Sequence, residues 1–272
     1  MPVPDADLRD AARQRPPLDA AALHAQLVRP GGLWRDIRVT GETGSTNADL
    51  LVEARAGAAE GLVLVAETQT AGRGRLGRSW SSPPRAALAC SVLLRPVTVP
   101  PAARAWLPLL TGMAVAAALR DAAGVTATLK WPNDVLVAGR KIAGILAEAH
   151  GDAIVVGVGL NVTLAAAELP APTATSLLLE DAACLDREQL LATVLTELAS
   201  RYTAWAARPD AAALREEYLR WSVTVGREVR VELPGGGQLT GTAADVDETG
   251  RLAVRTGSGT TLVGAGDVIH VR

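Results

Sequence analysis

The hydrophobic positions along the chain follow two patterns, one typical of helices and the other of strands. Apolar residues at helical spacing, bounded by capping residues and glycines, predict helices over residues 18–29, 45–57, 103–122, 186–208 and 211–221. Continuous or alternating apolar runs predict strands over residues 61–67, 86–96, 126–131, 135–137, 142–149 and 153–162. In the second helix we expect Thr46 as the N-cap, Asp49 at the capping-box position and Gly57 as the stop.

The connections between the last three predicted strands decide the fold class. The sequences AGR and HGD, which join them, are too short for a crossover, and connections this short join antiparallel neighbours. We therefore expect an α/β protein of the α+β type, with a mixed, largely antiparallel sheet flanked by helices. A parallel, doubly wound sheet is excluded.

The pattern of the chain changes at about Ser222. Residues 222–272 consist of short strand-like segments separated by the turn sequences PGGG, ETG and GSG. This pattern predicts a small closed β-barrel. We expect residues 18–221 to form the main domain, which contains the functional site. The polar, proline-rich residues 1–17 are predicted to be a flexible N-terminus.

Composition and charge exclude several classes of protein. Of the 272 residues, 49% are hydrophobic and 21% are charged, and the formal net charge of -2 provides no basic field for nucleic acid or an anionic membrane. No apolar run reaches the roughly 18 residues of a spanning helix, and the start, MPVPDADLRD, does not resemble a secretory signal. Cys90 and Cys184 lie far apart, which predicts a reduced, cytoplasmic chain without a cysteine-based metal site.

Rare residues give a first indication of a functional site. Almost all basic residues are arginine, and the only lysines are Lys130 and Lys141. The only asparagines are Asn47, Asn133 and Asn161. In a chain biased toward alanine, arginine and glycine, these rare residues are candidates for positions that no other residue can fill. For the two lysines the physical reason is that an ammonium is a compact point charge, whereas a guanidinium is a wide planar fork.

The segment 72–77, with the sequence GRGRLG, matches the GxGxxG pattern of dinucleotide-binding folds. That fold requires a helix at the third glycine and an acid about 20 residues later, and neither is found here. What remains is a loop over residues 68–84 in which Arg73, Arg75 and Arg78 offer forked donors to carboxylate or phosphate, and Trp80 an indole for stacking. A solvated loop and an RNA-binding RGG tract are the alternatives.

Four sequence blocks occur together and in order: GSTN (44–47), ETQTAGRGRLGRSW (67–80), KWPNDVLVAGRKIAGIL (130–146) and GVGLNV (157–162). With these blocks the chain resembles the biotin protein ligases, the biotin–[acetyl-CoA-carboxylase] ligase family, from about Gly41 to the C-terminus. The resemblance implies a sheet related to that of class-II aminoacyl-tRNA synthetases, followed by a small barrel.

The resemblance also implies a reaction in two halves. Biotin and ATP, with Mg²⁺ on the nucleotide, give biotinyl-5′-AMP and pyrophosphate. A lysine amine on the biotin carboxyl carrier domain of a carboxylase, such as acetyl-CoA carboxylase, then attacks the mixed anhydride to give an amide and AMP. No metal bound by the protein alone is expected.

Site residues are implied position by position. Biotin-binding positions match Ser45, Thr46, Asn47, Gln69, Arg73, Gly74, Arg75 and Lys141. Nucleotide-binding positions match Trp80, Asn133, Lys141 and Asn161. The catalytic positions match Lys141, Arg75 and Asp134.

Elementary electrostatics supports these roles, because joining a carboxylate to a phosphate brings two anions together. Lys141 and Arg75 are the candidate cations that would stabilise the developing charge. Lys130 is either a second such cation or the partner of an acid. Asp134 is a candidate base or orienting group, with an ordinary turn residue after Pro132 as the alternative.

Rival functions differ in testable ways. A lipoate–protein ligase shares the fold, but the arginine-rich loop and the C-terminal module favour biotin. A nucleic-acid-binding module is the rival of another class. Some members of the resembled family repress transcription through an N-terminal DNA-binding domain of about sixty residues, whereas 44 residues with one predicted helix precede Ser45 here, so we expect no DNA binding. We expect no membrane association, and a monomer or weak homodimer.

Overall fold

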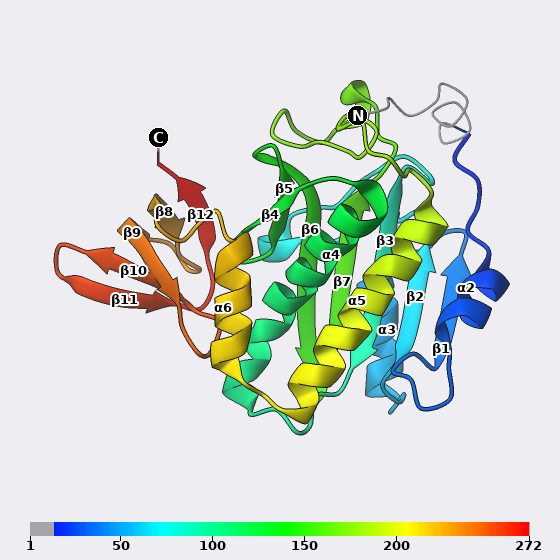
Figure 1. The fold of residues 1–272 in the computed structure, drawn as a ribbon, viewed down its shortest axis with the longest axis horizontal. Helices are drawn as coiled ribbons and strands as arrows, with labels where there is room; N and C mark the ends of the chain where they lie inside the picture. The colour runs from blue at the N-terminus through cyan, green and yellow to red at the C-terminus, as the bar shows by residue number, and fades with distance from the viewer. Residues whose placement is uncertain (1–13, 272) are drawn as a thin grey trace.

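The computed structural model of the protein describes residues 14–271 and has a seven-stranded sheet at its centre (Figure 1). The strand order is β1-β2-β3-β7-β6-β5-β4. β1 and β2 pair in parallel, and the other neighbouring strands of this sheet pair antiparallel, which confirms the predicted mixed sheet. The strands are β1 (Asp36–Thr40), β2 (Leu62–Ala66), β3 (Ala87–Leu94), β4 (Ala127–Lys130), β5 (Asp134–Val137), β6 (Arg140–His150) and β7 (Ala153–Asn161).

Helices cover the two faces of the sheet unequally (Figure 1). The long helices α4 and α5 pack on one face, and α3 packs on the other, where Leu50 and Leu51 meet Leu93 of β3 and Val155 of β7. The helical segments are α2 (Ala20–Leu27), α3 (Thr46–Arg55), η1 (Arg75–Gly77), η2 (Pro101–Trp106), α4 (Leu107–Ala123), η3 (Ala166–Glu168), α5 (Arg187–Ala207) and α6 (Ala211–Trp221). The N-terminus of α3 therefore opens onto the face that α4 and α5 leave free.

Within residues 14–271, one helical segment is long and apolar enough to span a membrane by length and composition alone. It runs over Pro101–Ala123, with a mean hydropathy of 1.4 in its most apolar window, so the expectation that no run reaches this length was too strict. In the structure 72% of that window is buried, and α4 within it packs against the sheet on one side and against its neighbour α5 on another. A buried core helix of a globular domain passes the same test, because it too is apolar on most sides.

Two local predictions need correction. The N-cap of α3 is Ser45, in extended backbone with its hydroxyl accepting from Ala48 N, and Thr46 is the first helical residue rather than the cap. β1 was not predicted, because it is an edge strand that carries Asp36 and Arg38 among few apolar residues. The predicted flexible segment 1–17 lies mostly outside the described residues, and of its described part Arg15 pairs with Glu168.

The C-terminal module is an open sheet and not the predicted closed barrel. Its order is β11-β10-β9-β8-β12, and among the described residues the two outer strands do not pair with each other. β12 instead contacts the glycine–arginine loop of the main domain, where Gly266 O accepts from Arg75 and Asp267 pairs with Arg78. The strands are β8 (Glu228–Glu232), β9 (Gln238–Val246), β10 (Leu252–Thr256), β11 (Gly259–Val263) and β12 (Asp267–His270).

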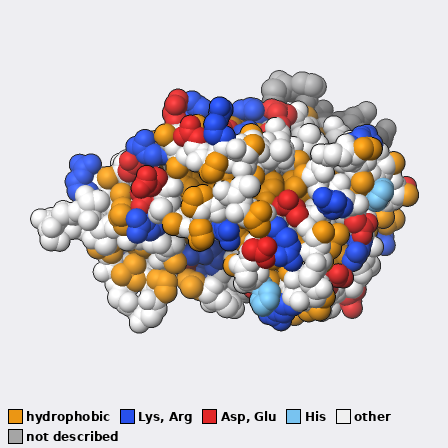
Figure 2. Space-filling view, turned by 90° about the horizontal axis from the view of Figure 1, so that it is seen from below, with side chains coloured by type: hydrophobic (Ala, Val, Ile, Leu, Met, Phe, Trp, Pro, Cys, Tyr) orange, Lys and Arg blue, Asp and Glu red, His pale blue; other side chains and the backbone are white. Residues whose placement is uncertain are grey.

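Charges of both signs are mixed over the face shown in Figure 2. Lysine and arginine side chains alternate there with aspartate and glutamate, separated by apolar and neutral groups. This face therefore carries no broad basic surface of the kind that binds a nucleic-acid backbone.

Candidate active site

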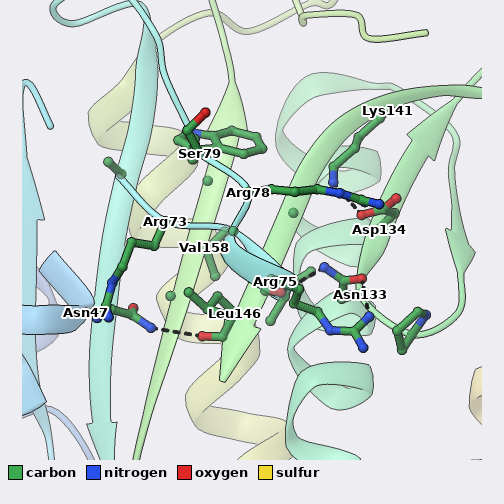
Figure 3. Close-up of a pocket in the computed structure, with 18 of the residues that line it drawn as sticks. Asn47, Arg73, Arg75, Arg78, Ser79, Asn133, Asp134, Lys141, Leu146 and Val158 are labelled. Carbon is green, nitrogen blue, oxygen red and sulfur yellow. Dashed lines mark hydrogen bonds and ion pairs between the residues drawn. The ribbon is translucent and has the colours of Figure 1, made fainter. Parts of the chain in front are cut away.

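A pocket with a cavity of about 240 Å³ lies on the sheet face opposite α4 and α5, between the N-terminus of α3, the loop 68–84 and β12 (Figure 3). It collects residues that are far apart in the sequence. Of the predicted site residues, eleven line it: Ser45, Thr46, Asn47, Gln69, Arg73, Gly74, Arg75, Trp80, Asn133, Asp134 and Lys141. Lys130 and Arg78 line it as well.

Asn161 is the one predicted site residue that does not line the pocket. It ends β7, its side chain is buried, and its Nδ2 donates to Thr175 O at 2.9 Å. In this structure Asn161 therefore holds the segment around Thr175. The same segment pairs with the backbone of Lys141, whose N donates to Thr173 O and whose O accepts from Thr175 N.

One end of the pocket, the α3 corner, consists of Ser45, Thr46, Asn47, Gln69 and Ser91. The first turn of α3 leaves backbone N–H groups without helical partners, and the Thr46 N–H donates to Gln69 Oε1 at 2.9 Å. Thr46 Oγ1 lies 3.1 Å from the same oxygen and 2.7 Å from Ser91 Oγ. Thr46, Asn47 and Ser91 are buried, so this corner is a preorganised polar surface.

The loop over the pocket folds back on itself. Gly74 N donates to Arg78 O at 2.6 Å and Trp80 N donates to Gly72 O at 2.8 Å. A Cβ on Gly72 would lie 2.3 Å from Trp80 O, so this approach requires glycine. Gly77 ends a short 3-10 turn and does not begin a helix, which confirms that the motif is not that of a dinucleotide-binding fold.

Three arginines of the loop are held by three different elements. Arg73 pairs with Glu148 of β6 at 3.0 Å. Arg75 donates to Asn133 Oδ1 at 3.1 Å and to Gly266 O at 3.4 Å, and Figure 3 shows the contact with Asn133. Arg78 pairs with Asp267 of β12. Both the main domain and the C-terminal module thus hold the loop over the pocket.

The other end of the pocket, the cation cluster, consists of Lys130, Lys141, Arg75 and Arg78 around Asp134. Lys141 Nζ lies 2.5 Å from Asp134 Oδ1. Burial lowers the pKa of Lys130, the charges of Lys141 and Arg78 lower it further, and Asp134 opposes the shift. Burial likewise lowers the pKa of Arg75, although a guanidinium stays charged. An excess of positive charge in a partly buried site favours an anionic ligand.

Glycines of the central strands make room in the pocket for the side chains of Trp80 and Lys141. A Cβ on Gly159 would lie 2.4 Å from Trp80 Cε2, and one on Gly144 would lie 3.3 Å from Lys141 Nζ. Gly144 and Gly159 are register partners on β6 and β7. The indole Nε1 of Trp80 is buried without a hydrogen-bond partner in the described structure, which leaves this donor free for an acceptor in the pocket.

Sequence reasoning did not find several residues of the site. Ser91 and Glu148 were missed, although a serine inside the apolar strand 86–96 is a buried polar group and therefore a signal. Gly157 and Gly159 lie in the block GVGLNV, where alternate glycines on a strand mark one face left open for close approach. Asp267 was missed because its role depends on the placement of the C-terminal module.

Comparison with known proteins shows the relationships of the chain. Residues 43–162 match the model of the biotin/lipoate A/B protein ligase family, and residues 224–271 match the biotin protein ligase C-terminal domain. The chain is 48% identical over 270 residues to a biotin–[acetyl-CoA-carboxylase] ligase of Mycobacterium tuberculosis, covering 97% of this chain and 100% of the relative. A ligase of the same name from Paracoccus denitrificans is 34% identical, with 83% and 97% of the two chains covered.

A solved structure supports the same relationship. The biotin protein ligase from Aquifex aeolicus in complex with biotin and ATP superimposes with a TM-score of 0.74 at 29% identity, covering 88% of this chain and 100% of that one. Sequence relatives, domain models and fold agree with the four sequence blocks and with the pocket in which they meet. The chain belongs to the biotin protein ligase family.

Proposed function

We propose that the protein activates biotin with ATP as biotinyl-5′-AMP and transfers the biotinyl group to a lysine of a biotin carboxyl carrier domain. One observation supports this most directly: a single pocket joins a neutral polar corner, at Thr46 and Gln69, to a cluster of cations around Lys141. Biotin has a neutral ureido ring at one end and a carboxylate at the other. The pocket offers a complementary surface to each.

The α3 corner binds the ureido ring in this proposal. Ser45, Thr46 and Gln69 present oxygen and amide groups on a rigid frame, because α3 and β3 are packed elements of the core. Asn47 follows Thr46 on α3 and lines the same corner, and its Nδ2 donates to Leu146 O at 3.2 Å (Figure 3). A buried, prearranged polar surface of this kind recognises one ring by its donors and acceptors.

The cation cluster performs the first half-reaction. A carboxylate oxygen of biotin attacks the α-phosphorus of ATP, the bond to the bridging oxygen breaks, and pyrophosphate leaves with Mg²⁺. Lys141 and Arg75 stabilise the negative charge that develops on the α-phosphate. Asp134 holds the Lys141 ammonium in place through the 2.5 Å ion pair.

Trp80 and Asn133 are assigned to the nucleotide, and Asn161 supports the site indirectly, through the Thr175 segment that pairs with the backbone of Lys141. The Trp80 indole lies against Gly144 of β6 and Gly159 of β7, and an indole is suited to stacking on a base. Among residues 14–271 no group of three or more His, Cys, Asp and Glu side chains forms a metal site, so Mg²⁺ enters in this proposal as part of the substrate MgATP.

In the second half-reaction the carrier lysine attacks the acyl carbon of the adenylate, and AMP leaves with the electrons of the broken acyl–oxygen bond. The amine must first lose a proton, and Asp134 is the carboxylate beside Lys141 that accepts it in this proposal. Arg73, Gly74 and Arg75 belong to the loop that covers the reactive anhydride and excludes water.

The cellular setting is part of the proposal. Cys90 and Cys184 are free thiols, which suits a reducing cytoplasm. The carrier domain of acetyl-CoA carboxylase is the expected partner, and we expect a monomer or weak homodimer that does not bind DNA. A gel-shift titration with duplex DNA at low salt checks the last point.

The experiment that tests the function is pyrophosphate exchange into ATP, with biotin compared to lipoate. We expect exchange that depends on biotin. Exchange with lipoate alone would identify the lipoate ligase of the same fold and overturn the proposal.

A further inference from the structure

A continuous line of polar side chains runs from the α3 corner out to the loop. Neighbouring polar atoms along it are 2.6 to 3.1 Å apart. Because its middle members are buried, each proton in the line must be assigned to a protein acceptor. In order, the polar line consists of Gln69, Thr46, Ser91, Asn47, Glu148 and Arg73.

Asn47 has one possible orientation in this line. Its amide nitrogen Nδ2 faces two acceptors, Glu148 Oε2 at 2.9 Å and Leu146 O at 3.2 Å. A flipped carboxamide would direct its oxygen at both of these oxygens, which is unfavourable in a buried site. The carboxamide oxygen, Oδ1, therefore faces Ser91, and Gly157, the register partner of Ser91, has no Cβ to occupy its place.

The direction of the next two hydrogen bonds follows from the number of protons. Ser91 Oγ lies 2.6 Å from Asn47 Oδ1, which only accepts, so the single hydroxyl proton of Ser91 is used there. Thr46 Oγ1 lies 2.7 Å from Ser91 Oγ and 3.1 Å from Gln69 Oε1, and its one proton can serve only one of these contacts. With the serine proton already used, the Thr46 proton goes to the shorter contact, with Ser91. The Thr46 hydroxyl then has no proton left for any other partner.

This assignment leaves two acceptors side by side at the pocket. Thr46 Oγ1 and Gln69 Oε1 are 3.1 Å apart, and no proton lies between them once the Thr46 proton points to Ser91. The other hydrogen bond of Gln69 Oε1, from the Thr46 backbone N–H, keeps the amide oxygen in this place. Two converging acceptors form a site for one N–H donor of a ligand, which would satisfy both.

We propose that Ser91, oriented by Asn47, is a positioning residue that makes Thr46 a hydrogen-bond acceptor, so that Thr46 and Gln69 together select a ring N–H. The inference rests on the proposed function, since the ureido ring of biotin supplies such a donor. A ring with an oxygen at the same place would set a third lone pair against two others. Sites built to bind a donor reject an analogue lacking it by roughly 10⁴–10⁵-fold.

Glu148 has a supporting place in the line. Its carboxylate accepts from Asn47 on one side and pairs with Arg73 of the loop on the other. The orientation of Asn47 needs an acceptor at this position but not a charge. Replacement by an uncharged acceptor therefore separates the two roles.

The test is pyrophosphate exchange with biotin and with a biotin analogue in which an oxygen replaces a ureido N–H. Ser91→Ala frees the Thr46 proton to turn toward Gln69. We expect the KM for biotin to rise about tenfold, kcat at saturating biotin to stay near that of the wild type, and the preference for biotin over the analogue to fall at least tenfold. Asn47→Ala, which lets Ser91 reverse, should reduce the preference in the same way.

Two further variants serve as controls. Ser91→Thr keeps the hydroxyl and should restore the preference, and Glu148→Gln keeps the acceptor for Asn47 and should retain it. If Ser91→Ala weakens biotin and the analogue by the same factor, Ser91 is merely structural and the inference is wrong. A wild-type protein without biotin-dependent exchange would instead overturn the proposed function.

Discussion

Lys141 and Asp134 form an ion pair across β5 and β6, with Lys141 Nζ 2.5 Å from Asp134 Oδ1. The two strands change register between Val135 and Leu136, so Lys141 faces Leu136 and not Asp134 in the backbone pairing. The long lysine side chain reaches back across this irregularity to the carboxylate (Figure 3), and its Nζ lies 6.0 Å from the centre of the Trp80 indole. The ammonium is thereby fixed inside the pocket, while the neighbouring Arg140 pairs with Glu180 outside it.

The first prediction concerns the shape of this cation. Lys141→Gln should lose about 10²–10³-fold in the rate of adenylate formation, the usual cost of removing one preorganised group that stabilises developing charge. Lys141→Arg should also be severely impaired, because a wide guanidinium cannot occupy the space of an ammonium between two oxygens. Single-turnover adenylate formation measures both rates.

Arg140→Ala is the matched control for this series, since it removes an exposed charge on the adjacent residue. Arg140 is itself exposed, and Glu180 keeps the hydrogen bond that it accepts from Thr175, so the effect on adenylate formation should be small. A Lys141→Arg enzyme that forms adenylate at nearly the wild-type rate would refute the point-charge argument.

The second prediction concerns retention of the intermediate. Arg75→Gly removes the contacts with Asn133 and with Gly266 O, and so weakens the hold of both domains on the loop. We expect adenylate to form but to escape, because the reactive anhydride is no longer enclosed. The released intermediate should label lysines of bystander proteins in the same solution, which mass spectrometry detects.

A matched control for Arg75→Gly is Arg85→Gly, just past the loop. Arg85 has a φ of 59°, a conformation that glycine adopts easily, and its side chain is exposed away from the pocket. This variant should retain adenylate as the wild type does. Tight retention by Arg75→Gly as well would contradict the prediction.

How much of the fold can be predicted from the sequence depends on how far apart in the chain the interacting residues lie. β6 and β7 could be predicted because two apolar runs flank a connection of three residues, which leaves one topology. The N-cap of α3 could not be predicted, because Ser45 and Thr46 are both good capping residues. The choice depends on Gln69, 23 residues away, which accepts the hydrogen bond from the Thr46 N–H. Local patterns also could not predict that the C-terminal module stays an open sheet, because the end of β12 contacts Arg75 and Arg78 of the main domain.

The site shows the same division. Charged and polar residues in unusual blocks, such as Arg73 and Lys141, were identified from the sequence and line one pocket. Ser91 and Glu148 were not, because their importance lies in hydrogen bonds to residues 44 and 75 positions away. Sequence spacing does not show which polar groups share protons across a sheet.

The third prediction concerns closure of the loop. Arg73, Arg75 and Arg78 are partly exposed cleavage sites for trypsin, and Leu76 between them is 57% exposed. Biotin with ATP should slow cleavage at all three several-fold, because ligand contacts add to the few that hold the loop. Asp267→Asn, which removes the charge partner of Arg78, should speed cleavage of the free protein. Unchanged cleavage on addition of both ligands would show that the segment is not a lid.

The fourth prediction follows from the protonation of Lys130. Burial is the largest cause of its lowered pKa. The charge of Asp134 acts in the opposite direction and raises the pKa, whereas the positive charges of Lys141 and Arg78 lower it further. A lysine whose pKa in the folded state is below its unfolded value destabilises the fold while protonated, so stability rises as pH rises from the folded pKa to the unfolded pKa. Triphosphate in the pocket adds negative charge and should raise the pKa again.

Binding of MgATP to the biotin complex should therefore take up a proton in the alkaline window between the lowered pKa and the ordinary value of 10.5, and the affinity should fall as pH rises through that window. Calorimetry in two buffers of different ionisation enthalpy measures the uptake. Lys130→Arg should abolish it while keeping a charge, because arginine does not titrate there. Burial lowers the pKa of His270 from its ordinary value of 6.5. His270 therefore gains and loses its proton at acidic pH, outside the alkaline range in which Lys130 takes up a proton. Equal uptake by wild type and Lys130→Arg would show that Lys130 does not contact the nucleotide.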